Sequence, residues 1–190
     1  MTDLCWPETD PRSGPVRLRA FRSGDVAMVE ELATDPYVPL IGSLPAHAGP
    51  AAAQDWISRQ RGRLAEGAGF SFCVAGEQDE PLGSAGLWLR DLAAGRASAG
   101  YAVRPSARGR GVAAHALVAL TAFAWTMPGL HRVELFVEPA NAASRRTAER
   151  AGYRFEGVLR QHQEIGGRRR DMCSYAALRT DGLPGPAGIV

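Results

Sequence analysis

The period of the hydrophobic positions changes repeatedly along the chain, and each period predicts an element. Residues 16–21 (VRLRAF) alternate apolar and basic side chains, as a half-buried strand does. Segments rich in β-branched and aromatic residues predict further strands at 70–76, 82–92, 96–104 and 131–139, and a closing hairpin at 153–178 around Gly166-Gly167. The second and third of these strands flank the short sequence AAG, which predicts a hairpin between them.

Helical periods fill most of the intervals between these strands. They cover 23–36, 51–67, 111–124 and 141–152, whereas 39–50 holds three prolines and two glycines and is expected to be a loop. In the third helix, Leu117, Leu120 and Ala124 recur at the spacing of a helix that packs on a sheet. The order of elements predicts an α/β (α+β) fold with a mixed sheet.

The composition is that of one soluble domain. The 190 residues are 45% hydrophobic and 22% charged, which suffices for one core and is short for two. We expect residues 16–179 to form this domain between flexible, Pro- and Gly-rich tails at 1–15 and 180–190.

Charge, hydropathy and cysteine usage narrow the class of protein. The net charge is +2, from 22 basic and 20 acidic residues, a smaller excess than a general nucleic-acid-binding protein carries. No apolar run is long enough to span a membrane, and residues 1–15 lack the apolar core of a signal peptide. The three cysteines form no CxxC pair and the four histidines share no metal-binding spacing. We therefore expect a cytoplasmic protein without a metal site that binds neither nucleic acid nor membranes.

An arginine- and glycine-rich corner separates the strand at 96–104 from the helix that follows. Glycines allow a positive φ and close approach of a ligand, and the first N–H groups of a helix favour anions. A P-loop would need Lys and Ser or Thr after Gly111, and a dinucleotide-binding fingerprint would need a glycine at Ala114. The corner thus predicts a phosphate site of another type, with a tight turn carrying surface arginines as the alternative.

The corner resembles the signature of the GNAT superfamily of acyl-CoA N-acetyltransferases, Q/R-x-x-G-x-G/A, in the stretch Arg108-Gly109-Arg110-Gly111-Val112-Ala113. Downstream, the segment 133–160 is similar to the branch that acetylates N-terminal amines of ribosomal proteins (RimJ/RimL-like). The residues that carry this second resemblance are Asn141, Ser144, Gly152-Tyr153, Glu156-Gly157 and Arg160.

The resemblance implies a single GNAT-like domain whose mostly antiparallel, mixed sheet is splayed in the middle and flanked by helices. It also implies acetyl-CoA as the acetyl donor, with coenzyme A as product, and binding residues at the corner, on the preceding strand and on the next helix. These are Ala102, Val103, Arg108, Gly109, Arg110, Gly111, Val112, Ala113, Asn141 and Arg146. Helix capping is the alternative for Asn141, and a solvated side chain the alternative for Arg146.

The resemblance is weaker for the catalytic groups. Ser144 stands where this branch places the hydroxyl that assists the leaving thiolate, and an ordinary helix serine is the alternative. The two positions at which relatives carry a glutamate base are Ser98 and Phe136. Glu134 and Glu138 lie two residues either side of Phe136 and are the substitute candidates, with salt-bridged carboxylates as the alternative.

The resemblance implies transfer of an acetyl group from acetyl-CoA to a primary amine by direct attack, with the N-terminal α-amine of a protein or peptide as the expected acceptor. Acetylation of a small-molecule amine and non-catalytic acyl-CoA binding are the alternatives. Because the last strands often form dimer contacts in relatives, a homodimer is also possible.

Overall fold

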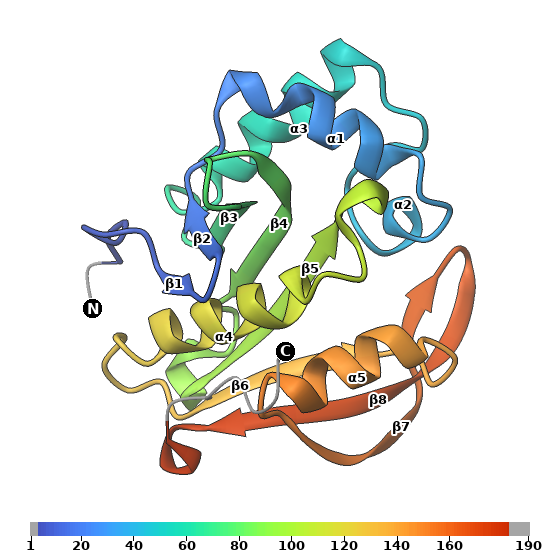
Figure 1. The fold of residues 1–190 in the computed structure, drawn as a ribbon. Coiled ribbons are helices and arrows are strands. Elements are labelled where there is room, and N and C mark those ends of the chain that lie inside the picture. Colours follow the sequence, from blue (N-terminus) through green and yellow to red (C-terminus); the bar gives the residue numbers. More distant parts are fainter. Residues whose placement is uncertain (1–3, 183–190) are drawn as a thin grey trace.

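The strand-like segments come together in one eight-stranded mixed sheet in the computed structural model, which describes residues 4–182. The strands follow the order β1-β2-β3-β4-β5-β6-β8-β7 across the sheet (Figure 1). They are β1 (Arg12–Ser13), β2 (Val16–Arg19), β3 (Gly69–Ala75), β4 (Pro81–Trp88), β5 (Arg96–Val103), β6 (Arg132–Val137), β7 (Arg154–Ile165) and β8 (Arg168–Leu178).

Helices cover both faces of this sheet. They are α1 (Val26–Ala33), α2 (Val38–Ile41), α3 (Pro50–Gly62), α4 (Val112–Ala124) and α5 (Ala142–Arg150), with 3-10 turns at Ser23–Asp25, Leu92–Ala94, Pro105–Ala107 and Arg179–Asp181. The α4 helix lies in front of the strands in Figure 1, and its buried Leu117 and Leu120 belong to the same apolar cluster as Phe70 and Phe72 of β3. A second cluster joins α1 to α3 and contains Met28 and Ile57. Each face thus has its own core.

The sheet divides between β5 and β6. These strands are parallel and pair only at Arg96–Arg132, Ala97–Val133 and Ser98–Glu134, after which β5 follows β4 while β6 follows β8. All other neighbouring strands are antiparallel. The prediction of a mixed, mostly antiparallel sheet splayed in its middle is therefore confirmed.

The chain termini differ from the expected tails. Residues 4–15 pack on the domain, because β1 pairs with β2 and the Trp6 ring lies 4.7 Å from that of Phe72. The segment is apolar at Leu4 and Trp6, and both side chains contact the core cluster. At the other end, residues 179–181 form a 3-10 turn, and 183–190 lie outside the described residues.

Local boundaries also differ in two helical regions. The expected loop at 39–50 begins with the last residues of α2, where Pro39 occupies one of the first helical positions that tolerate proline. The helix α3 ends at Gly62 rather than near residue 67, and a turn with a positive φ at Gly67 follows it. The turn of the last hairpin is as expected, with φ of 57° and 72° at Gly166 and Gly167.

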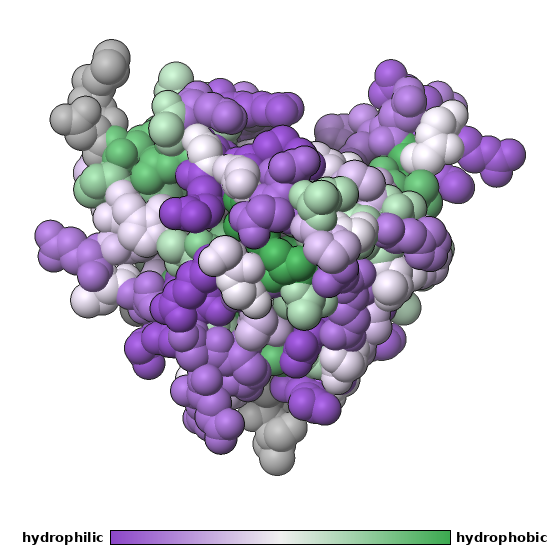
Figure 2. All heavy atoms as spheres, turned by 90° about the horizontal axis from the view of Figure 1, so that it is seen from above, coloured by the Kyte–Doolittle hydropathy of each residue, from purple (hydrophilic) through white to green (hydrophobic). Residues whose placement is uncertain are grey.

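The molecular surface seen from above in Figure 2 is mostly hydrophilic, with smaller hydrophobic patches between the polar residues. Within residues 4–182, no helix combines the length and the apolar character that crossing a membrane requires.

Candidate active site

Two cavities meet at the gap between β5 and β6. The larger, of about 700 Å³, is bordered by residues of α2, α3, β4 and the β7–β8 hairpin. The smaller, of about 460 Å³, is bordered by the turn before α4 and by α5. The residues that line both cavities are Tyr37, Val38, Ile41, Tyr101, Ala102, Asn141 and Ser144.

The glycine corner lines the smaller cavity. Gly109 and Gly111 have φ of 78° and 75°, in the left-handed region that favours glycine. The first N–H groups of α4 to find a backbone partner are those of Ala114 and His115, which both donate to the Gly111 carbonyl, at 3.0 and 3.1 Å. The preceding N–H groups, up to that of Ala113, donate no backbone bond among the described residues and remain for an anion.

The two arginines of the corner do not face this cavity in the same way. The Arg108 side chain lines it, but its Nε donates to the Val103 carbonyl at 3.0 Å and its Nη2 lies 2.6 Å from Asp35. Its charge is therefore paired, and it holds the turn against the segment before α2. Arg110 is exposed and is not among the lining residues.

Strand alternation decides which backbone groups of β5 face the gap. The N–H of Arg104 donates to the Leu82 carbonyl of the strand beside it, so Ala102, two residues earlier, also directs its backbone groups toward β4. Tyr101 and Val103 consequently direct theirs toward the gap. Of the two residues expected to bind the pantetheine through their backbone, Val103 therefore directs its backbone groups toward the gap and Ala102 does not.

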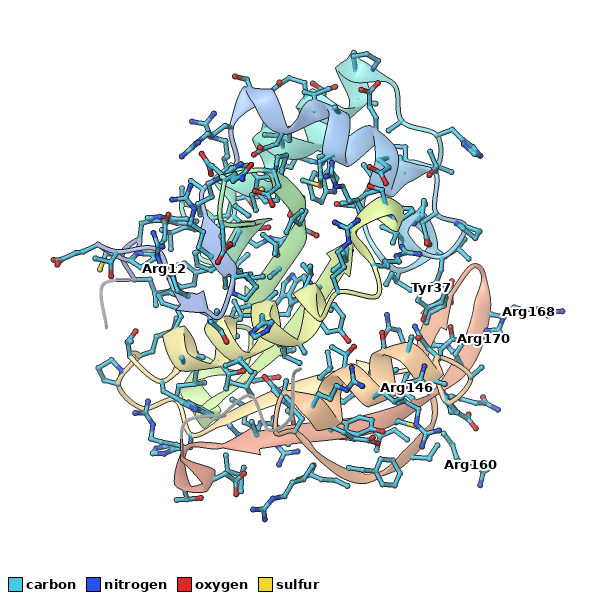
Figure 3. The ribbon with its side chains drawn as sticks, viewed as in Figure 1. Arg12, Tyr37, Arg146, Arg160, Arg168 and Arg170 are labelled. Carbon is cyan, nitrogen blue, oxygen red and sulfur yellow. The ribbon has the colours of Figure 1, made fainter. Side chains whose placement is uncertain are left out.

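The helix α5 brings its first turn and one of its faces to the cavities. Asn141 caps this helix, because its Oδ1 accepts the N–H of Ser144 at 3.0 Å, and both residues line the two cavities. Arg146 and Arg150 lie one turn apart and line the smaller cavity. Figure 3 shows Arg146 on α5, with Arg160 farther out on β7.

A tyrosine side chain extends from β5 across the gap to α5. The Tyr101 hydroxyl donates to the Ser144 carbonyl at 3.4 Å, and burial raises the pKa of this phenol, so it stays protonated. It is a second hydroxyl donor beside that of Ser144. The sequence contains a signal for it, since a tyrosine within a strand of alanines and glycines must fill more space than its neighbours.

The two candidate carboxylates lie outside the linings of both cavities. Glu134 accepts from Arg132 Nε at 2.8 Å, and Glu138 lies 3.5 Å from Arg170 Nε. Glu138 also contributes, after burial, to the raised pKa of the Tyr37 hydroxyl, which Figure 3 places beside the hairpin tip that carries Arg170. The surroundings of both glutamates are therefore those of salt-bridged carboxylates, the alternative given above. Ser98, by contrast, lines the larger cavity.

No cluster of three or more His, Cys, Asp or Glu side chains within residues 4–182 could hold a metal ion. The smaller cavity instead combines unpaired backbone N–H groups with the arginines of α5, a donor set that fits a diphosphate with further phosphate nearby.

A mixed sheet splayed beside a glycine turn with unpaired N–H groups defines an acyltransferase architecture, and the family comparison agrees with it. The acetyltransferase (GNAT) domain model matches residues 16–154. The chain therefore belongs to the GNAT family and is an acetyl-CoA-dependent N-acetyltransferase.

Individual relatives cover most of the chain. The uncharacterized N-acetyltransferase p20 of Bacillus licheniformis is 27% identical over 165 residues, 86% of this chain and 93% of that protein. RimJ of Mycobacterium smegmatis, solved in complex with CoA-disulfide, is 28% identical with a TM-score of 0.77, covering 90% of this chain and 85% of that one. RimL, a ribosomal L7/L12 α-N-protein acetyltransferase solved with coenzyme A, has a TM-score of 0.72 at 18% identity, covering 88% and 96%.

Proposed function

We propose that this enzyme acetylates the N-terminal α-amine of a protein or peptide. The observation that carries the proposal is the meeting of two cavities at the gap between β5 and β6. The smaller offers the phosphate-binding groups, and the larger has room for several residues of an acceptor chain. The similarity to RimJ and RimL supports an acceptor of this kind.

The smaller cavity would hold acetyl-CoA, which supplies the acetyl group as a thioester. The N–H groups of residues 109–113 would bind the diphosphate, and Arg146 and Arg150 a further phosphate. The gap-facing backbone groups of Tyr101 and Val103 would pair with the pantetheine arm as a neighbouring strand does. The N–H of Val103 is the candidate donor to the thioester carbonyl, which leaves the Val103 carbonyl and the Tyr101 backbone for the rest of the arm.

Two hydroxyls are positioned to assist departure of the thiol. Ser144 and Tyr101 both line the gap. The Ser144 hydroxyl can donate a hydrogen bond to a leaving sulfur atom, whereas the Tyr101 hydroxyl must first give up its bond to the Ser144 carbonyl. Because a thiol has a pKa of about 8.5, its thiolate leaves readily near neutral pH, and the contribution of each hydroxyl should be moderate.

The larger cavity has no carboxylate among the described residues that line it. An acceptor that is partly deprotonated in water suits such a cavity. At pH 7 an α-amine with a pKa of about 7.7–8.0 is roughly one-tenth neutral, whereas a lysine side chain near 10.4 is neutral about once in 2,500. The difference favours a protein or peptide N-terminus over lysine side chains and polyamines.

The test measures acetyl-CoA turnover with a panel of amines. The release of free thiol gives the rate, and mass spectrometry identifies the acetylated acceptor. We expect acetylation of peptides with a free N-terminus and none of the same peptides with a formylated N-terminus. Ser144→Ala should lower kcat by about tenfold, below the usual range for general acid catalysis because a thiolate needs little assistance to leave, without changing the affinity for CoA. If spermidine or an aminoglycoside were acetylated faster than the peptides, the acceptor would be a small molecule. Binding of CoA without any turnover would favour a non-catalytic role.

A further inference from the structure

The floor of the larger cavity is built by two glycines and a tryptophan. Gly86 of β4 and Gly100 of β5 are direct partners in the sheet, and the Trp88 indole lies over both. A Cβ atom at Gly86 would lie 3.1 Å from Trp88 Cη2, and one at Gly100 would lie 2.9 Å from Trp88 Cζ3. The indole can lie against the sheet here because both residues beneath it are glycines, which have no Cβ atom to collide with it.

This floor carries an arginine. The Arg63 guanidinium, which comes from the end of α3, lies 5.0 Å from the centre of the Trp88 ring. Its Nη1 would be 3.3 Å from a Cβ at Gly86, so it reaches over the same floor. A cation over an indole face is attracted by the negative charge of the ring face, which fixes the guanidinium without neutralising it.

The Arg63 guanidinium forms no ion pair with an acidic side chain among the described residues. No salt bridge or side-chain hydrogen bond joins it to another group in residues 4–182. Burial lowers its pKa, Glu66 opposes this shift from a distance, and Arg90 adds to it. A partly desolvated cation that forms no ion pair gains more from an anionic ligand than an exposed one does.

The remainder of the cavity has the same sign of charge. Arg63 and Arg90 are the two charged residues in its lining among the described residues. The other polar groups are neutral, among them Gln60, whose Oε1 accepts the Ser71 hydroxyl at 2.9 Å. Such a cavity repels a polycation and attracts a carboxylate, which a guanidinium binds through two parallel hydrogen bonds.

We infer that the acceptor carries a carboxylate near its reactive amine and that Arg63 binds this carboxylate. The inference rests on the proposed function and specifies its acceptor as an N-terminus with Asp or Glu at the second or third residue. Gly100, under the indole, and Ala102, at the gap, are two residues apart on β5, about 7 Å at the rise of a strand. Two residues of an extended acceptor span the same distance.

The experiment compares matched peptides that differ only at the second or third residue, with Asp or Glu, the amide Asn or Gln, or Lys there. For the wild-type enzyme we expect kcat/KM for the acidic peptides to exceed that for the amides by about tenfold or more, mainly through KM. Arg63→Met keeps the apolar stem over Trp88 and removes the charge, and it should reduce the preference to within about twofold. The control is Arg61→Met, which removes one charge from an exposed position on the same helix that lines neither cavity.

Calorimetry with CoA verifies that each variant retains its fold and its coenzyme site. Equal turnover of acidic and amide peptides by the wild type would overturn the inference while leaving the proposed function intact, as would a preference that Arg63→Met and Arg61→Met reduce equally. Turnover of free aspartate or glutamate but of no peptide would sink the proposed function and the peptide acceptor together. Binding of the acidic peptide to the CoA-loaded enzyme, measured separately, should weaken in Arg63→Met alone, and unchanged binding would contradict the role of Arg63.

Discussion

At the scale of single residues, Asn141 combines a structural contact with a position at the site. Its Oδ1 accepts the Ser144 N–H and so caps α5, while its side chain lines both cavities. The amide NH2 group takes no part in the cap and remains available to a ligand. The two interpretations that the sequence leaves open, capping and coenzyme contact, are therefore compatible.

Two substitutions at this position separate these roles. Asn141→Asp keeps an oxygen for the cap and removes the NH2 donor, so we expect stability near that of the wild type and weaker binding of CoA. Asn141→Ala removes both groups and should also lower the free energy of unfolding by about 1 kcal/mol. Urea unfolding and calorimetry with CoA measure the two effects. Wild-type affinity in Asn141→Asp would reduce Asn141 to a helix cap.

At the scale of elements, the turn into α4 is the part that we propose binds the diphosphate of the coenzyme. Gly109 has a φ of 78° and no protein atom within 4 Å of an added Cβ, so a side chain there would extend into free space beside the smaller cavity. Gly129, in the turn after α4, has the same φ and the same free space, and it lines neither cavity. The two positions differ in location alone.

This pair provides a matched test of the turn. Gly109→Leu and Gly129→Leu should each destabilise the fold by about 1–2 kcal/mol, because both force a side chain into the left-handed region. Only Gly109→Leu should also weaken CoA binding strongly, because its side chain would occupy the space in front of the N–H groups. The measurements are thermal unfolding and calorimetry. If both variants bound CoA equally well, the turn would not be the diphosphate site.

At the scale of the whole molecule, an ion-pair network joins β2 to the start of α1 and to the turn between β3 and β4. Arg19 donates two bonds to Asp25 at 2.8 Å and one to Asp79 at 2.7 Å, and Arg17 and Arg22 also pair with Asp79. Asp79 sits in the turn between β3 and β4 with a φ of 67°. Burial alone would raise its pKa, but the three arginines outweigh burial and lower the pKa from 3.8 to about 2.

The lowered pKa determines how this network responds to acid. Its contribution to stability is fully present above a pH of about 4 and is lost as the pH falls through about 2. Asp79→Asn tolerates the left-handed φ but lacks the charge, so it should be less stable at neutral pH and lose less stability between pH 4 and 2. Glu77→Gln, an exposed change in the same turn, is the control. An unchanged acid profile in Asp79→Asn would assign the acid sensitivity to other groups, such as Asp25. Burial alone would raise the pKa of Asp25, but its bonds to Arg19 outweigh burial and lower this pKa.

Much of the fold could be predicted from the sequence, because local period and turn residues specify most elements. The pairing of β4 with β5 and the Gly166-Gly167 turn follow from such local signals. The N-terminal segment could not be predicted in this way. Its proline and acidic residues resemble a tail, and only the contact of Trp6 with Phe72 across the chain gives it a place.

The candidate site was predictable to the extent that it is local. The glycine turn before α4 and the cap at Asn141 each depend on a few consecutive residues. The pairing of Arg108 with Asp35 and the approach of Arg63 to Trp88 join segments far apart in the chain. No local pattern reports such contacts, because they exist only when the sheet and helices have packed.

The sequence by itself determined most elements of this protein, the glycine turn before α4 and the family, since these depend on local conformational preferences and on a contiguous motif. The tertiary structure decided which charges are paired and which face a cavity. It turned Arg108, Glu134 and Glu138 toward partners and left Arg63 facing the larger cavity. The physical reason is that the free energy of a charge depends on its neighbours in space and on its access to water, and folding establishes both.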